Sequence, residues 1–342
     1  MGSKITDLLE TKELRVEDLK DKILAVDAFN TLYMFLTTIR GADGSPLMDS
    51  KGRITSHLQG LLSRFLKYVE QDIKFVFVFD GKPPVLKEKE TQRRRAAKKK
   101  ALELYNKAKD EKDFENMKKY AARTTFLTED IIDQTKKVLD LMGIPWIQAP
   151  SEGEAQAAYL VKKGDAYAVV SQDADALLFG TPKLIKNLSL SGRVKKQSTQ
   201  LTKKVMPELI NLKNTLENLG INQEQLINLA ILVGTDYNYG GIKGIGPKKA
   251  LKLVKTTASE EEIFEKAKWE EHMDISWKEI KKVIQTMPVT DDYTISFQKP
   301  DIEGVEEYLK SFEFGEERIN NFSERLQKLH QKRKQKDLSQ FF

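Results

Sequence analysis

The chain has 342 residues, with 57 Lys and Arg against 51 Asp and Glu, a formal net charge of +6, no Cys and three His. This length allows one large core or two, and the scarcity of Cys and His excludes a thiolate or His-rich zinc site. No apolar run approaches the roughly 18 residues of a membrane span, and the first residues lack the apolar stretch of a signal peptide. We therefore expect no membrane partner.

The first part of the chain alternates apolar strands with amphipathic helices. Strands are predicted at 23–27 and 75–80, and helices are predicted up to residue 39 and from about 54 to 69. This alternation predicts an α/β fold with a mostly parallel, twisted sheet flanked by helices.

Charge interrupts the alternation over residues 87–120. Between Lys82 and Lys100 stand nine Lys and Arg and two Glu, and a sparse apolar side follows. The pattern predicts a basic insertion of one or two amphipathic helices at about 82–126. A solvated helix face of no particular function is the alternative, since most charge runs are that.

Beyond the insertion the α/β pattern resumes. A helix is predicted at 128–142, strands at 145–148 and 167–170, and further strands at 181–204. Another helix runs from 222 to about 233, and charged helical segments follow residue 256. We expect one domain over residues 1–330, with parts at 1–130, 131–260 and 261–330, and a tail at 331–342 that has no structure of its own.

Seven carboxylates fall at the ends of these predicted apolar elements. Strand ends carry three groups of them. A helix predicted to begin with Ser151 as its N-cap carries two in its first turn, and one more follows the helix that ends near residue 233. They are Asp27, Asp80, Glu152, Glu154, Asp173, Asp175 and Asp236. Ligands of open parallel sheets bind at the carboxyl ends of the strands, so the acids are expected to converge there.

Each pair of acids also has an ordinary explanation. Glu in the first turn of a helix complements the helix dipole, and Asp after a strand is common in turns. All seven together would repel strongly unless cations lie among them. A set of oxygen ligands suits Mg²⁺ or Mn²⁺.

A glycine loop at 234–250 joins two predicted helices. Gly244 and Gly246 allow close approach of the backbone to a partner, Pro247 suits the first turn of a helix, and Lys248 and Lys249 follow. This helix-loop-helix element is expected to bind phosphates of a partner without reading bases.

The last residues of the sequence combine charge with a few apolar side chains. Gln335, Leu338, Phe341 and Phe342 have the spacing of a short anchor that orders on a protein partner. Packing of these residues back onto the body is the alternative.

Several long stretches, in order, resemble the flap endonuclease family of structure-specific 5′ nucleases, most closely its archaeal members. They are ILAVDAFNTLY, VFVFDGKPPVLK, APSEGEAQAAYL, SQDADALLFG, GTDYN and GIKGIGPKKA, together with a tail similar to the motif that docks on the DNA sliding clamp. The motifs span residues 1 to about 260 and the last eight, and residues 260–330 carry less of them.

The resemblance implies a role for each matching position. The seven acids match the ligands of two Mg²⁺ ions, for which Mn²⁺ can substitute. Lys87 and Arg94 match a basic pair at the scissile phosphate, and Tyr33 matches an aromatic on which a substrate base stacks. GIKGIGP matches a loop that holds duplex DNA with the help of K⁺, and the insertion matches a gateway for the 5′ single strand.

The implied function is cleavage of branched DNA at the base of 5′ flaps, with 5′–3′ exonuclease activity, in Okazaki fragment maturation and repair. The implied location is the cytoplasm of an archaeon, at the nucleoid, or a eukaryotic nucleus. Two alternatives stay open: a relative that cuts bubbles or four-way junctions, and a catalytically inactive adaptor for the clamp.

Overall fold

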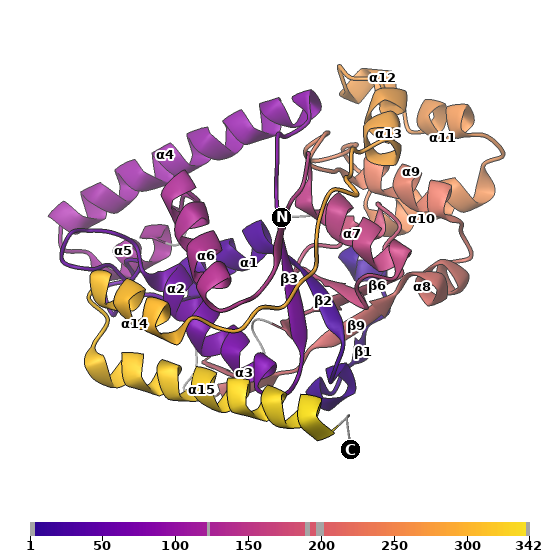
Figure 1. Cartoon of the computed structure of the whole chain (residues 1–342). Helices are drawn as coiled ribbons and strands as arrows, with labels where there is room; N and C mark the ends of the chain where they lie inside the picture. Colours follow the sequence, from indigo (N-terminus) through magenta and orange to yellow (C-terminus); the bar gives the residue numbers. More distant parts are fainter. Residues whose placement is uncertain (1–3, 122–123, 189–191, 196–201, 340–342) are drawn as a thin grey trace.

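A seven-stranded sheet forms the centre of the computed structural model, which describes residues 4–121, 124–188, 192–195 and 202–339 (Figure 1). The strand order is β1-β9-β6-β5-β2-β3-β4. The bounds are β1 Lys12–Glu13, β2 Ile23–Asp27, β3 Lys74–Phe79, β4 Trp146–Gln148, β5 Ala168–Val170, β6 Lys183–Lys186 and β9 Glu208–Asn211. Strands β2 to β6 pair in parallel, and β9 pairs antiparallel with both β6 and β1. The expected α/β fold with a mostly parallel sheet is confirmed.

Both faces of the sheet are covered, which explains why its strands are apolar without interruption. In β2, Leu24 and Val26 belong to one buried cluster and Ala25 to the other. The Leu24 side of the sheet packs against α1 (Ala28–Thr38), α2 (Ser56–Gly60), the π-helical η3 (Leu61–Phe65) and α3 (Leu66–Val69). There the ring of Phe65 lies 4.9 Å from that of Phe75 and 5.0 Å from that of Phe77, measured between centroids.

The other face carries α7 (Gly153–Lys163), α9 (Gln223–Val233), α10 (Pro247–Thr256) and α13 (Trp277–Gln285). Two helices, α4 (Glu88–Asp110) and α5 (Phe114–Ala121), occupy the stretch where the basic insertion is expected, and α4 extends along one side of the molecule (Figure 1). The remaining elements are η1 Lys4–Leu8, η2 Val16–Leu19, η4 Val85–Lys87, α6 Glu129–Leu141, η5 Asp175–Leu177, β7 Gly192–Lys195, β8 Thr202–Val205, α8 Leu212–Leu219, α11 Glu260–Lys266, α12 Trp269–His272, α14 Ile302–Ser311 and α15 Glu316–Ser339.

The order of the strands creates a point where the chain changes direction across the sheet. From β2 the chain moves to β3 and β4 on one side, and then returns to β5 on the other side of β2. In open α/β sheets, ligands bind at such a switch point, outside the carboxyl ends of the strands. The acids at the ends of β2, β3 and β5 therefore share the edge where a site is expected.

Two expectations about helix ends need correction. Ser151 does not cap α7: Glu152 is the N-cap residue, because the Ser151 hydroxyl donates instead to the carbonyl of Lys82, 2.9 Å away. The tail is also helical further than expected, since α15 continues to Ser339. Residues 316–339 contain neither Gly nor Pro and are rich in Glu, Lys, Arg, Gln and Leu, which favour helix.

No helix among the described residues is long and apolar enough to cross a membrane.

Candidate active site

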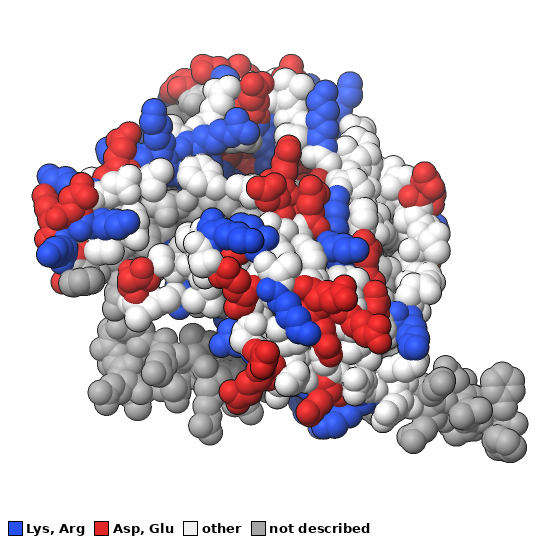
Figure 2. Space-filling view, turned by 60° about the vertical axis from the view of Figure 1, so that its left-hand side comes forward, with Lys and Arg blue, Asp and Glu red and all other residues white. Residues whose placement is uncertain are grey.

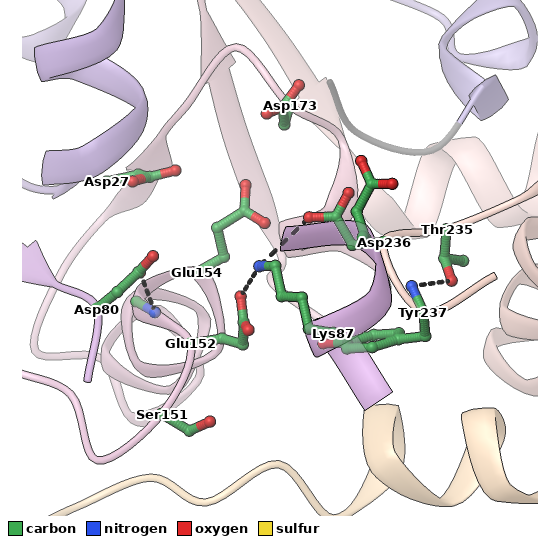
Figure 3. Close-up of polar contacts among 12 residues, drawn as sticks. Asp27, Asp80, Lys87, Ser151, Glu152, Glu154, Asp173, Thr235, Asp236 and Tyr237 are labelled. Atoms are coloured by element: carbon green, nitrogen blue, oxygen red, sulfur yellow. Dashed lines mark hydrogen bonds and ion pairs between the residues drawn. The ribbon is translucent and has the colours of Figure 1, made fainter. Parts of the chain in front are cut away.

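The acids expected to converge line a single cavity of about 450 Å³ at the carboxyl edge of the sheet. Its walls include all seven of them, Asp27, Asp80, Glu152, Glu154, Asp173, Asp175 and Asp236, and also Tyr33, Lys87 and Arg94. In Figure 3, labelled acids from different parts of the chain, among them Asp27, Glu154 and Asp173, border the same space. The structure thus brings together ten of the residues singled out by sequence.

The start of α7 is fixed against the end of β3. The backbone N–H of Gly153 donates to Oδ1 of Asp80 at 2.7 Å (Figure 3). A Cβ atom on Gly153 would stand 2.6 Å from that same oxygen, closer than carbon and oxygen can approach. The absence of a side chain between Glu152 and Glu154 therefore lets this turn of the helix approach Asp80 directly.

A tight turn after α9 places Asp236. The N–H and hydroxyl of Thr235 both donate to Oδ1 of Asn238, at 3.1 and 2.7 Å, and Nδ2 of Asn238 donates to the carbonyl of Ile231. Thr235 and Asn238 are buried. The turn is thereby tied to the helix before it, and Asp236 extends from it into the cavity.

Two cationic side chains reach the acids from the start of the insertion. Nζ of Lys87 lies 2.5 Å from Oε2 of Glu152 and 3.3 Å from Oδ2 of Asp236 (Figure 3). Nη2 of Arg94 lies 2.5 Å from Oδ1 of Asp236, while its Nε lies 2.6 Å from Glu90. Glu90 is itself buried and also binds Arg93, so it orients both arginines.

Burial and mutual repulsion raise the pKa of several of the acids. Burial, reinforced by the charges of Asp80 and Asp173, raises the pKa of Asp27 to about 8. Burial also raises the pKa of Asp80, and burial together with the charge of Asp27 raises the pKa of Glu154 well above its usual range. Desolvation and neighbouring charges of like sign act in this direction on carboxyls. The cavity is short of positive charge.

Lys87 supplies part of that charge. Burial alone would lower its pKa, but the carboxylates of Glu152 and Asp236 outweigh burial and raise the pKa. Burial raises the pKa of Glu152, although Lys87 opposes it. Lys87 is therefore a fixed cation within the site.

The sequence did not predict the roles of two further polar residues of the site. Asn30 donates from Nδ2 to Oδ2 of Asp173 at 3.0 Å and accepts at Oδ1 from the N–H of Gln172. Oγ of Ser171 lies 3.2 Å from Oδ2 of Asp27 and 3.1 Å from Oε1 of Glu154. Asn30 stands three residues after Asp27 and Ser171 two before Asp173, so proximity to the acids is the only signal the sequence offers.

The donor set of the cavity fits divalent ions that prefer oxygen ligands, since every candidate ligand is a carboxylate and no Cys exists. Within the described residues, however, no three His, Asp or Glu side chains are arranged to hold an ion as they stand. Lys87 and Arg94 draw Glu152 and Asp236 toward themselves. As they stand, these two carboxylates are therefore engaged by cationic side chains.

The glycine loop lies apart from the cavity walls. Pro247 begins α10, with Gly246 as N-cap, and Gly244 has a φ of +82° that side chains rarely adopt. Ile242 and Ile245 are buried, whereas Lys248 and Lys249 are exposed. Buried isoleucines thus anchor the loop while its glycines and lysines face solvent.

The residues of the expected partner anchor are only partly described. Gln335 and Leu338 belong to α15, and Phe341 and Phe342 lie outside the described residues.

Charge on the surface is mixed. Figure 2 shows Lys and Arg interspersed with Asp and Glu over the face that it presents, without one continuous basic area. Attraction of a polyanion by this face must depend on local groups more than on the net charge.

This fold and this acid-lined cavity define a structure-specific nuclease of the XPG class. Residues 3–101 match the XPG N-terminal domain and residues 143–236 match the XPG I-region. The chain is 49% identical to flap endonuclease 1 of Pyrococcus abyssi, over 100% of this chain and 98% of that protein. It belongs to the flap endonuclease 1 family, and is accordingly a structure-specific endonuclease for 5′ flaps.

Solved structures agree with this assignment. Flap endonuclease-1 from Methanococcus jannaschii superposes with a TM-score of 0.76 at 42% identity, over 97% of this chain and 100% of that one. Human GEN1, solved in complex with Holliday junction DNA, superposes with a TM-score of 0.67 over 95% of this chain and 77% of that one. Its identity is 21%, so it shares the fold alone.

Proposed function

We propose that the seven carboxylates hold two divalent ions, Mg²⁺ or in its place Mn²⁺, and that the cavity hydrolyses the phosphodiester at the base of a 5′ flap. The observation that carries this proposal is the convergence of seven acids, Lys87 and Arg94 on one cavity. The raised pKa values of Asp27 and Glu154 support it, because bound cations would relieve the repulsion that raises them.

When bound, the two ions supply a metal-activated water and neutralise charge on the attacking and leaving oxygens. Lys87 and Arg94 donate to the non-bridging oxygens of the scissile phosphate, where negative charge is spread in the transition state. To do so they release Glu152 and Asp236, which become available as ligands. Asn30 holds Asp173, and Gly153 holds Asp80. The products carry a 5′-phosphate and a 3′-hydroxyl.

Recognition of the substrate follows from shape. The 5′ single strand passes beneath α4, whose Thr91, Arg94, Arg95 and Lys98 line the cavity together with Lys87, the residue just before the helix, and a base stacks on Tyr33. The glycine loop holds duplex phosphates through its N–H groups, Lys248 and Lys249, and a K⁺ ion bound at the loop would add positive charge there. A free 5′ end threaded in the same way gives 5′–3′ exonuclease cleavage.

The tail couples the nuclease to a second protein. Gln335, Leu338, Phe341 and Phe342 dock on the DNA sliding clamp, which places the enzyme at replication and repair intermediates. The protein works with chromosomal DNA, at the nucleoid in the cytoplasm of an archaeal cell.

One panel of substrates tests the activity. Labelled 5′ flap, four-way junction and bubble DNA are incubated with the protein and Mg²⁺, and with chelator as control. Cleavage of the flap alone, or far faster than the others, supports the proposal. Preference for the junction would favour the GEN1-like alternative, and failure to cut any of the three would favour an inactive adaptor.

A further inference from the structure

An exposed aromatic side chain lies at the entrance of the acid-lined cavity, beside Tyr33. Phe126 is 40% exposed and is one of the cavity's wall residues. Single exposed apolar residues are common on proteins. Phe126 differs from such a residue in its neighbours, since it shares the cavity wall with the aromatic proposed to stack on substrate.

The backbone on either side of Phe126 is held in place. The hydroxyl of Thr125, which is buried, accepts from Nη2 of Arg40 at 2.5 Å, and Arg40 also donates to the carbonyls of Thr37 and Gly44. Leu127 packs on the core cluster beneath α1 to α3. Thr125 and Leu127 are thus held against the body of the protein, whereas Phe126 between them is exposed to solvent.

Lys98 joins the two rings. Its Nζ lies 4.5 Å from the centroid of the Tyr33 ring and 5.2 Å from that of Phe126, and it donates to the hydroxyl of Tyr33 at 2.9 Å. One ammonium group is therefore in contact range of both rings. A flat group that displaces it can touch both rings as well.

We propose that Tyr33 and Phe126 together hold one unpaired nucleobase of the DNA strand that enters the cavity, while Lys98 moves to the adjoining phosphate. This inference rests on the proposed function and extends it by naming a second stacking residue. A cation beside two π-faces suits a nucleotide, whose base stacks and whose phosphate is anionic. Rings recognise every base by its face, so the site holds a base of any identity.

Fluorescence of 2-aminopurine measures this contact without requiring catalysis. Flap substrates carry 2-aminopurine at single positions on either side of the cleavage point, and binding is followed in Ca²⁺ or in chelator. We expect quenching at one position with the wild-type protein. In Phe126→Ala that quenching should largely disappear and affinity for the flap should fall about tenfold, the order of one base–aromatic stack. Affinity for the same duplex without a flap should not change.

Three further variants make the result decisive. Phe126→Trp retains a ring and should retain quenching and affinity. Phe126→Leu keeps apolar bulk without a π-face and should behave as the alanine variant, so full quenching with leucine overturns the proposal. Val289→Ala removes an apolar side chain that is exposed to a similar extent, 38%, elsewhere on the surface, and should change neither quantity.

The same preparation separates this inference from the proposed function. Wild-type protein that cuts flaps in Mg²⁺, with unchanged quenching in Phe126→Ala and Phe126→Leu, overturns the second stacking residue and leaves the function intact. Wild-type protein that cuts no flap overturns the function on which the inference rests.

Discussion

Nζ of Lys87 lies 2.5 Å from Oε2 of Glu152, although 65 residues of sequence separate the two. Both side chains are largely buried, and burying one charge without the other would cost several kcal/mol. Lys87 therefore balances the charge of an acid that we propose as a metal ligand. Arg94 bears the same relationship to Asp236, 2.5 Å away. Each cation thus forms an ion pair with a carboxylate that lines the cavity.

We predict that Arg94→Ala lowers the single-turnover cleavage rate by about two to three orders of magnitude, the usual loss when one donor to a developing negative charge is removed. Affinity for the flap should change far less, because exposed cations elsewhere still attract the phosphates. Rapid-quench kinetics and binding titrations measure the two quantities. Lys99→Ala removes an exposed cation from the same helix and should leave the rate close to wild type. Equal losses of rate and affinity in Arg94→Ala would make Arg94 a general attractor of DNA.

The acids and the basic pair of the candidate site show what the sequence can and cannot predict. Asp27 and Asp80 were found because each ends a continuous apolar run, and the carboxyl ends of parallel strands meet at one edge. The resemblance to the family identified Lys87 and Arg94 as a basic pair. It could not predict that both would bind Asp236, because that depends on how α4 crosses a turn 142 residues further along the chain.

Other features of the site had no signal at all. Asn30 and Ser171 act through hydrogen bonds to acids from other elements, and neither residue type is unusual where it stands. The expected cap at Ser151 was wrong because the carbonyl of Lys82, distant in sequence, competes for its hydroxyl. In each of these cases the hydrogen bonds of the side chain depend on tertiary contacts. Strands and long helices, by contrast, are predictable from local sequence.

Asp173 offers a test of the metal site. Asp173→Ala or Asp175→Ala should abolish cleavage, because each removes a proposed oxygen ligand from a cavity that contains no Cys or His to replace it. Flap binding in Ca²⁺ or chelator should persist, since the duplex is held elsewhere. Asp173→Asn keeps the hydrogen bond with Asn30 possible while removing the charge, and should be as inactive as the alanine variant. Cutting at near the wild-type rate with Mg²⁺ by either alanine variant would refute the assignment.

The glycine loop should bind duplex without regard to its sequence. Lys248→Glu with Lys249→Glu should weaken binding of all duplexes alike and reduce the slope of log affinity against log salt by about two, one for each lost phosphate contact. Titrations at several salt concentrations measure the slope.

A matched control for the loop comes from Lys299→Glu with Lys310→Glu, which changes the net charge equally at two exposed lysines near α14. That pair should alter the slope much less. A loss that depends on DNA sequence would point to base reading, and no loss would remove the loop from the DNA-binding surface.

Acid should destabilise the fold through His57, which is fully buried between α2 and α6. Burial lowers its pKa to about 3, and the Gln134 side chain beside it offsets only part of this effect. The folded-state pKa thus lies below the unfolded value of about 6.5. As the pH falls through 6.5, His57 binds a proton in the unfolded chain but stays neutral in the folded protein. The free energy of unfolding then drops by about 1.4 kcal/mol per pH unit, or about 2 kcal/mol by pH 5.

His57→Leu removes this titration. Urea unfolding of the variant and the wild type at pH 7 and pH 5 should show that the variant loses less stability between the two, by about 2 kcal/mol. Carboxyl groups titrate in both proteins and cancel in the comparison. Identical losses would mean that His57 takes up its proton in the folded state.

The proposed anchor for the sliding clamp is the feature furthest from the nuclease site in sequence. Leu338 and Phe342 are four residues apart and Phe341 lies three from Leu338, so one helical turn puts all three on one face. Ordering a few residues costs roughly 1–2 kcal/mol each, and burying two Phe and a Leu returns about 1.5–3 kcal/mol apiece. The balance allows micromolar affinity, which tethering to a clamp already on DNA would strengthen.

We therefore predict that Phe341→Ala with Phe342→Ala removes stimulation of flap cleavage by the clamp. Cleavage without the clamp should stay at the wild-type level, because the cavity walls come from residues 27–236. Rates measured while clamp is titrated against both proteins decide the matter. Lys334→Ala with Lys336→Ala alters charges in the same segment and should leave stimulation largely in place. Undiminished stimulation of the double Phe variant would mean that the clamp binds elsewhere, and loss of clamp-free activity would make the tail part of the folded nuclease.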